Sequence, residues 1–131
     1  MSHVTADWYT LLANSVAEKT TKQITGVIQD EAGNALGSTV LTALTLTLYP
    51  KATPATKINA RDQQNVLNAN GVTVDASGNL VWTATPLDNV VVNTALTEEQ
   101  HIALFEYTWA AGAKGGKHLI EFTVTNLPTV S

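Results

Sequence analysis

Three histidines are the side chains of this sequence best suited to catalysis or metal binding. They are His3, His101 and His118. No two of them have the i, i+4 helical spacing or the i, i+2 strand spacing of a metal site. His101 and His118 could approach each other across a hairpin, near Glu121. A pocket that held His101, His118 and Glu121 together would favour an enzyme. We interpret both instead as solvated residues at strand starts.

The acidic residues do not follow a calcium-binding pattern. An EF-hand needs oxygen ligands at alternating positions of one loop, and Asp30, Glu31, Asp62, Asp75 and Asp88 form no such series. Asp and Asn also stabilise turns through their own side chains, which explains most of the five. Catalysis needs a nucleophile with a base, paired carboxylates or a metal cluster. We therefore predict no catalytic residue, metal or cofactor, and a protein that is not an enzyme.

Two further patterns have both a functional and a structural interpretation. Residues 112–116 are glycine-rich, but the Gly-Lys-Ser/Thr ending and following helix of a phosphate-binding loop are missing, so a hairpin loop is favoured. Trp8, Trp82 and Trp109 could stack on sugars, although one Trp on an alternating strand is typical of a core. Exposure of Trp82 or Trp109 would favour an alternative function, a carbohydrate- or receptor-binding module.

The elements that must position these residues are short strands. Period 2 is clearest at 44–49, where three leucines share one face. Gly78 suits the turn of a hairpin, and residues 110–117 suit a glycine-containing hairpin loop. The remaining predicted strands are 23–29, 72–74, 80–83, 88–93, 102–109 and 118–125.

The last two predicted strands carry large apolar side chains at alternate positions, so that they lie on one face of each strand. If their apolar faces coincide, six side chains line one layer of the core, and each contributes about 1.5 to 3 kcal/mol on full burial. About seven short strands without a long helix predict an all-β, antiparallel, immunoglobulin-like β-sandwich. The six side chains are Phe105, Tyr107, Trp109, Ile120, Phe122 and Val124.

An N-terminal arm is expected over residues 1–22, followed by the sandwich domain over residues 23–131. Apolar residues recur every three to four positions within residues 6–18, with Thr5 or Asp7 available as a cap, so the arm could contain a short helix. The arm is apolar enough to dock on a neighbouring subunit. The partner-binding residues that we predict in it are Trp8, Tyr9, Leu11 and Leu12.

Residues 58–72 are the most distinctive segment, rich in amides and containing the only arginine, Arg61. In a structural interpretation, Asn and Gln satisfy backbone groups while Val66 and Leu67 fill the core. In a functional interpretation, Arg61 anchors an interface. Both remain open, and Arg61 is kept as a fifth candidate partner-binding residue.

Four stretches of the chain resemble small immunoglobulin-like proteins encoded among the virion genes of tailed bacteriophages. They are residues 58–72, 74–82, 101–109 and 117–124, within a pattern that covers residues 23–127. The resemblance implies a structural protein of the virion, either a capsid decoration or cement protein or an accessory subunit of the head–tail neck or tail. It implies capsid, neck or tail proteins as partners, in a symmetric homo-oligomer, and no catalytic residues.

Composition argues against several other classes. The formal net charge is −4, and the seven Lys and Arg are scattered, so nucleic acid is not an expected partner. Cysteine is absent, which excludes disulfides and thiolate chemistry. No apolar run approaches the roughly 20 residues that span a bilayer, and no secretory signal is recognisable. We expect a protein made in the host cytoplasm and located in the virion, without membrane contact.

Overall fold

The protein is all-β throughout the residues that its computed structural model describes, 8–12 and 15–126. In that part of the chain there are nine strands and no helix, and hence no helix able to cross a membrane. The strands are β1 (Trp8–Leu11), β2 (Val16–Ala17), β3 (Lys22–Val27), β4 (Leu41–Pro50), β5 (Gln64–Asn65), β6 (Val72–Val74), β7 (Asn79–Ala84), β8 (Glu98–Trp109) and β9 (Lys114–Thr125).

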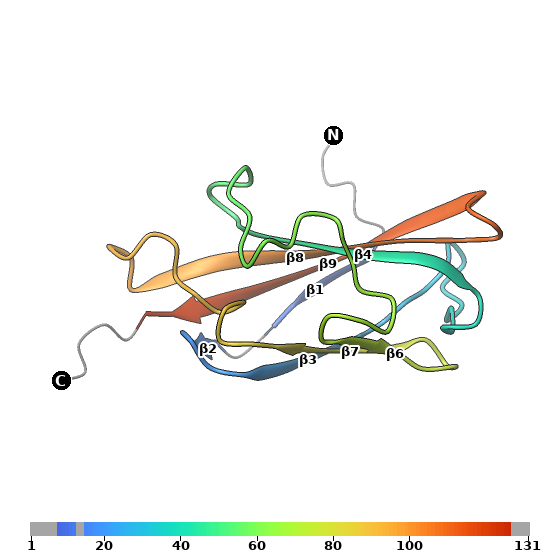
Figure 1. Ribbon diagram of the computed structural model, residues 1–131, viewed down its shortest axis with the longest axis horizontal. Coiled ribbons are helices and arrows are strands. Elements are labelled where there is room, and N and C mark those ends of the chain that lie inside the picture. Colours follow the sequence, from blue (N-terminus) through green and yellow to red (C-terminus); the bar gives the residue numbers. More distant parts are fainter. Residues whose placement is uncertain (1–7, 13–14, 127–131) are drawn as a thin grey trace.

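The described strands form two sheets that face each other. The larger has six strands in the order β1-β9-β8-β4-β5, with β2 also paired to β9, and the smaller has the order β3-β7-β6. Figure 1 shows β3, β7 and β6 as one layer and β4, β8 and β9 as the other. The arrangement is consistent with the predicted β-sandwich.

The hairpin of β8 and β9 is the longest paired unit of the structure. Its register runs without a break from Glu98 opposite Thr125 to Trp109 opposite Lys114. The predicted hairpin is confirmed, but its loop is shorter than predicted because residues 114–117 continue the ladder. Gly116 lies opposite Tyr107, and a Cβ atom there would come within 2.8 Å of the Tyr107 ring. Glycine therefore serves here as a strand residue that allows a close approach.

The core fills the space between the two sheets. All six side chains predicted from the last two strands are at most 7% exposed, and Leu44, Leu46 and Leu48 of β4 are fully buried. Trp82 of the smaller sheet packs edge-on against Phe105 and Phe122, with ring centroids 6.0 and 5.9 Å apart. The predicted coincidence of the two apolar faces is therefore confirmed, as is the hairpin of β6 and β7, in which Gly78 has φ +83°.

The N-terminal segment is not helical where the structure describes it, which corrects that part of the prediction. β1 and β2 both lie parallel to β9, with Trp8 opposite His118 and Val16 opposite Val124. The larger sheet is therefore mixed rather than purely antiparallel. Val16 is 3% exposed and packs in the core, so burial and pairing with a distant strand outweigh a weak local helical pattern. Thr5 and Asp7, the predicted caps, lie outside the described residues.

Residues 88–93 form a connection and not the predicted strand. The backbone amides of Val92 and Asn93 donate to the Glu99 carboxylate at 2.7 and 2.9 Å. Asn89 is fully buried and donates through its side-chain amide to the Thr20 carbonyl at 2.8 Å. Side chains rather than a neighbouring strand thus satisfy these backbone groups, a role that the local apolar pattern does not reveal.

A buried ion pair joins this connection to residues 58–72. Arg61 Nε donates to Asp88 Oδ1 at 2.6 Å, and Arg61 Nη2 donates to Asp88 Oδ2 at 3.1 Å. Asp88 also accepts from the Asn59 side chain and from the Thr85 amide. Burial by itself raises the pKa of Asp88, but the hydrogen bonds from Arg61, Asn59 and Thr85 outweigh it and hold that pKa below its ordinary value. The structural interpretation of residues 58–72 is the one that the structure shows.

Replacing Asp88 with Ala should lower the free energy of unfolding by about 3 to 5 kcal/mol, because the guanidinium of Arg61 would stay buried without its counter-charge. Urea unfolding followed by tryptophan fluorescence would measure the loss. Asp62→Ala removes an exposed carboxylate close by in sequence and should change stability by less than about 0.5 kcal/mol. Equal losses in the two variants would contradict a specific role for the pair.

Candidate functional site

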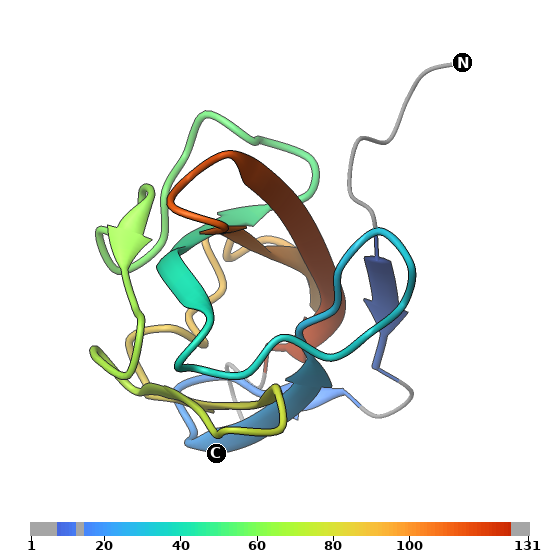
Figure 2. The ribbon, with the colours of Figure 1, turned by 90° about the vertical axis from the view of Figure 1, so that its right-hand side faces the viewer.

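The first strand presents apolar side chains and free backbone groups at one edge of the larger sheet. Tyr9 and Leu11 are 56% and 58% exposed. The Leu12 amide donates to the Glu121 carbonyl, so the backbone groups of the alternate residues Tyr9 and Leu11 point away from β9. Figure 2 shows β1 at the outer edge of the molecule. Such an edge is a template for binding another chain.

Two side chains of β9 hold β1 in place. The Tyr9 hydroxyl donates to Glu121 Oε1 at 2.7 Å, and the Thr10 hydroxyl lies 2.9 Å from His118 Nε2. His118 Nδ1 lies 3.2 Å from the Val27 carbonyl of the smaller sheet. A carbonyl only accepts, so in the neutral ring Nδ1 carries the proton and Nε2 accepts from Thr10. His118 therefore links β1 to both sheets.

At neutral pH, His118 and Glu121 are both in the protonation state that accepts a hydrogen bond from β1. Burial lowers the pKa of His118, against the opposing effect of its hydrogen bond to Val27. Burial acts to raise the pKa of Glu121, but hydrogen bonds from Tyr9 and Lys51 outweigh it and leave that pKa below its ordinary value. The same hydrogen bond to Glu121 raises the pKa of Tyr9. A neutral imidazole and an ionised carboxylate thus face the strand.

Lys51 connects this edge to a neighbouring cleft of about 600 Å³. Its Nζ donates to both oxygens of Glu121, at 3.1 and 3.3 Å, and the same residue lines the cleft. Val92 and Leu96, which are 42% and 40% exposed, supply apolar surface there. Through Glu121, Lys51 therefore links Tyr9 of β1 to the cleft, across β9 and β8. We name this region the arm–cleft surface, defined by Tyr9, Leu11, Lys51, Val92 and Leu96.

The buried carboxylate in the wall of this cleft, that of Glu99, is already occupied by partners. Glu99 accepts from the Val92 and Asn93 amides, and its Oε1 lies 2.7 Å from His101 Nε2. Burial lowers the pKa of His101, with Glu99 acting in the opposite sense. The neutral ring donates through Nε2, while the fully buried Nδ1 has no hydrogen-bond partner in the described structure. The pair fixes the cleft wall and does not present a base to the solvent.

Both described histidines are buried, which corrects the prediction of solvated strand ends. His101 and His118 are 0% and 6% exposed. They lie opposite Phe122 and Phe105, so both point between the sheets, whereas Glu121 lies opposite Ile102 on the outer face. The strands begin earlier than predicted, at residues 98 and 114, which places both histidines inside them. His101, His118 and Glu121 therefore do not converge on one site. His3 lies outside the described residues.

The predicted partner-binding residues are placed in different environments. Tyr9 and Leu11 are on the surface, whereas Leu12 is partly buried against the core. Trp8 belongs to β1, and its side chain lies outside the description. Arg61 is only 4% exposed and is bound to Asp88, so it offers no surface to a partner. Sequence reasoning considered Glu121 only as a neighbour of the histidines and missed Lys51, Val92 and Leu96, because no local pattern signals that Lys51 joins Glu121 to the cleft.

Other chemistry considered from the sequence has structural explanations here. Trp82 and Trp109 are 0% and 7% exposed, which confirms their interpretation as core residues. Asp30 and Asp75 accept backbone amides of their own turns, as turn chemistry predicts. Among the described residues, no three His, Asp or Glu side chains are grouped so as to hold a metal ion.

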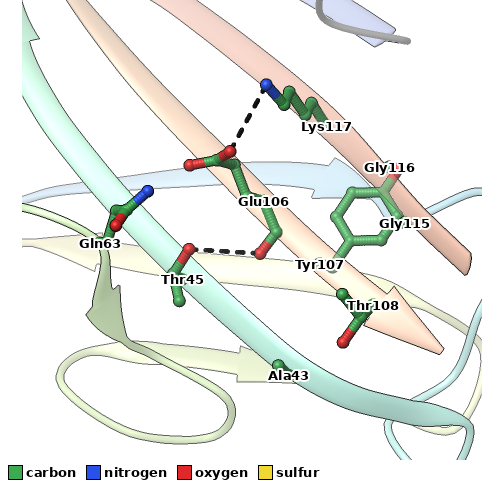
Figure 3. A pocket seen from close by; sticks show the side chains of 9 residues that line it. All are labelled: Ala43, Thr45, Gln63, Glu106, Tyr107, Thr108, Gly115, Gly116 and Lys117. Carbon is green, nitrogen blue, oxygen red and sulfur yellow. Dashed lines mark hydrogen bonds and ion pairs between the residues drawn. The ribbon is translucent and has the colours of Figure 1, made fainter. Parts of the chain in front are cut away.

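A second hollow, of about 620 Å³, lies on the outer face of the larger sheet. Figure 3 shows Glu106 and Lys117 facing each other across β8 and β9, with 3.5 Å between Oε2 and Nζ. The Thr45 hydroxyl donates to the Glu106 carbonyl at 3.5 Å. Gly115 and Gly116 leave part of the lining without side chains. Glu106 and Lys117 neutralise each other's charge, so this hollow has no net charge from that pair with which to attract a charged ligand.

Acid should release Tyr9 from Glu121. The pKa of Glu121 is lowered in the folded protein. The stabilisation from its hydrogen bond with Tyr9 is therefore complete above the ordinary pKa of glutamate and is lost as the pH falls through the lowered pKa. NMR signals of the Tyr9 ring should therefore titrate in acid. The variant Glu121→Gln should abolish this titration. A Tyr9 signal that stays constant between neutral pH and the acid end of the titration in the natural protein would refute the contact.

Gly116→Ala should lower the free energy of unfolding by about 1 to 3 kcal/mol, because the new methyl group would overlap the ring of Tyr107. That ring cannot yield easily, since it stacks on Trp109 and its hydroxyl donates to the Gln29 carbonyl. Gly115→Ala is the matched control: its Cβ would meet ordinary contacts at 3.5 Å or more, and its stability should stay within about 1 kcal/mol. Thermal unfolding would compare them, and equal stabilities would contradict the close approach.

Known proteins do not guide the interpretation of this surface. Comparison with models of protein families, with curated proteins and with solved structures found no match.

Proposed function

We propose that this chain is a non-enzymatic structural protein of a tailed-phage virion, either a capsid decoration or cement protein or a head–tail neck accessory subunit. It binds neighbouring virion proteins through the arm–cleft surface. The observation that carries the proposal is the open edge of β1, where Tyr9 and Leu11 are more than half exposed and Lys51 links Tyr9 to an apolar cleft through Glu121. Exposed apolar side chains that adjoin an unpaired strand edge are typical of protein-binding surfaces.

The buried ionisable groups support a structural role. Arg61 and Asp88 hold two connections together, and Glu99 and His101 fix the cleft wall. Each of these carboxylates is occupied by several donors, so burial and hydrogen bonding serve the fold. Perturbed ionisable groups also occur at active sites, but these two pairs are shielded by their own partners.

The chain's low charge suits repeated contact with other proteins. Charged residues make up 14% of the sequence, against about 25% in typical soluble domains. The arm–cleft surface is small, so a single contact would be modest. In a symmetric particle, many copies would bind tightly together through effective concentration.

The finer parts of the proposal come from the resemblance over residues 23–127. It supports an immunoglobulin-like arrangement of the sandwich, partners among capsid, neck or tail subunits, and a virion location after synthesis in the host cytoplasm. The alternative, a carbohydrate- or receptor-binding module of a tail or fibre, requires exposure of Trp82 or Trp109. Both side chains are buried, and nothing in the part of the chain that the structure describes favours that module.

Binding to phage particles that lack this subunit tests the proposal, with imaging of where the protein lands. Tyr9→Ser with Leu11→Ser, and separately Val92→Ser with Leu96→Ser, should each weaken binding at least about tenfold, or about 1.4 kcal/mol, because they remove apolar contacts at the interface. Substitutions are cleaner than deletion of residues 1–20, which would also remove Val16 from the core.

The control is Leu87→Ser with Val40→Ser, which removes exposed apolar residues outside the arm–cleft surface, 65% and 47% exposed. It should bind as the natural protein does. Failure of the natural protein to bind any part of the particle would reject the virion role. Equal binding by all variants would reject the arm–cleft surface as its means.

A further inference from the structure

The N-terminal segment is attached to β9 in two unequal halves. β2 is anchored by Val16, which is 3% exposed in the core. In the N-terminal half, by contrast, Tyr9 and Leu11 are exposed, Thr10 and Leu12 are only partly buried, and none of the described side chains of residues 9–12 is fully buried. Segments with few buried apolar contacts open at low free energy. β1 can therefore leave β9 while β2 remains in place.

The edge that β1 covers is built to receive this particular strand. In register, Tyr9 lies opposite Leu119 and Thr10 opposite Ile120. Glu121 then accepts from the Tyr9 hydroxyl, and His118 accepts from the Thr10 hydroxyl. Glu121 and His118 are 6% exposed and Ile120 is 1% exposed beside β1. A strand with Tyr and Thr at successive positions satisfies both side chains, and a second copy of this chain carries that strand.

We propose that β1 is exchanged between copies, so that β1 of one copy pairs with β9 of another. This rests on the proposed function, which makes the arm the assembly element. The exchanged pair forms the same hydrogen bonds as the closed monomer. The equilibrium between closed monomers and exchanged copies is therefore set by protein concentration. Dilute protein keeps its own strand, and crowded copies in a particle exchange it.

Exchange would make the arm–cleft surface a composite of two copies. Tyr9 and Leu11 of one copy would lie beside Lys51 and the cleft of the other, because Glu121 binds Tyr9 and Lys51 together. The complete surface would then form between any two exchanged copies. Binding to other virion proteins would follow assembly of this chain with itself.

Cysteine trapping tests the exchange directly, because the natural chain contains no cysteine. The variants Tyr9→Cys and Leu119→Cys are prepared separately, mixed at high protein concentration and oxidised. Neither chain can bridge internally, so a disulfide between the two positions reports strand exchange. Loss of the Tyr9 hydroxyl weakens docking equally in the closed and exchanged forms, and the contact of Thr10 with His118 remains.

The matched control mixes Tyr9→Cys with Thr123→Cys, which lies on the same face of β9 but out of register. The in-register heterodimer should form in at least about tenfold excess, because Cα atoms more than about 7 Å apart cannot be bridged. Non-reducing gels and mass mapping of the disulfide would measure both products. Equal yields, or no heterodimer, would overturn the exchange. Either result would leave arm-dependent binding to particles standing, since that is measured separately.

Discussion

The register between β8 and β9 is the constraint on which the rest of the structure depends. Successive side chains of a strand point to opposite faces, so a shift of one residue would exchange the inward and outward sets. In the observed register, His101, Phe105 and Phe122 face the smaller sheet, whereas Ile102 and Glu121 face outward. The first set builds the core around Trp82, and the second builds the outer face on which Tyr9 and Lys51 meet. Core and candidate binding surface are two sides of one ladder.

Buried polar groups take over where strands end. The connection over residues 85–97 is held by carboxylates, Asp88 at one end and Glu99 at the other. Each accepts backbone amides as well as a cationic or imidazole donor, so burial does not leave a charge without partners. Arg61, bound to Asp88 and lying over the Trp82 ring at 5.9 Å, joins this polar layer to the aromatic core. The irregular segments are therefore as closely specified as the sheets.

The arm belongs to the fold and also forms the surface that we propose for binding. β1 completes the edge of the larger sheet, yet it leaves its own outer edge unpaired and two apolar side chains exposed. Besides its backbone ladder with β9, β1 is held by two side-chain hydrogen bonds, to Glu121 and to His118. A strand held in this way can extend the sheet, pair with another protein or be exchanged between copies without altering the sandwich beneath it.

Sequence by itself determined the elements whose signals are local. The alternation at 44–49, the turn at Gly78 and the matched aromatic faces of the last hairpin predicted β4, the β6–β7 hairpin and the β8–β9 hairpin, because period and turn chemistry act between near neighbours. Tertiary structure alone decided that residues 8–11 form a parallel strand, that both described histidines and Arg61 are buried, and that Lys51 joins the arm to a cleft. These outcomes depend on partners that are distant along the chain, and no local pattern records which partner a strand or a charge will meet.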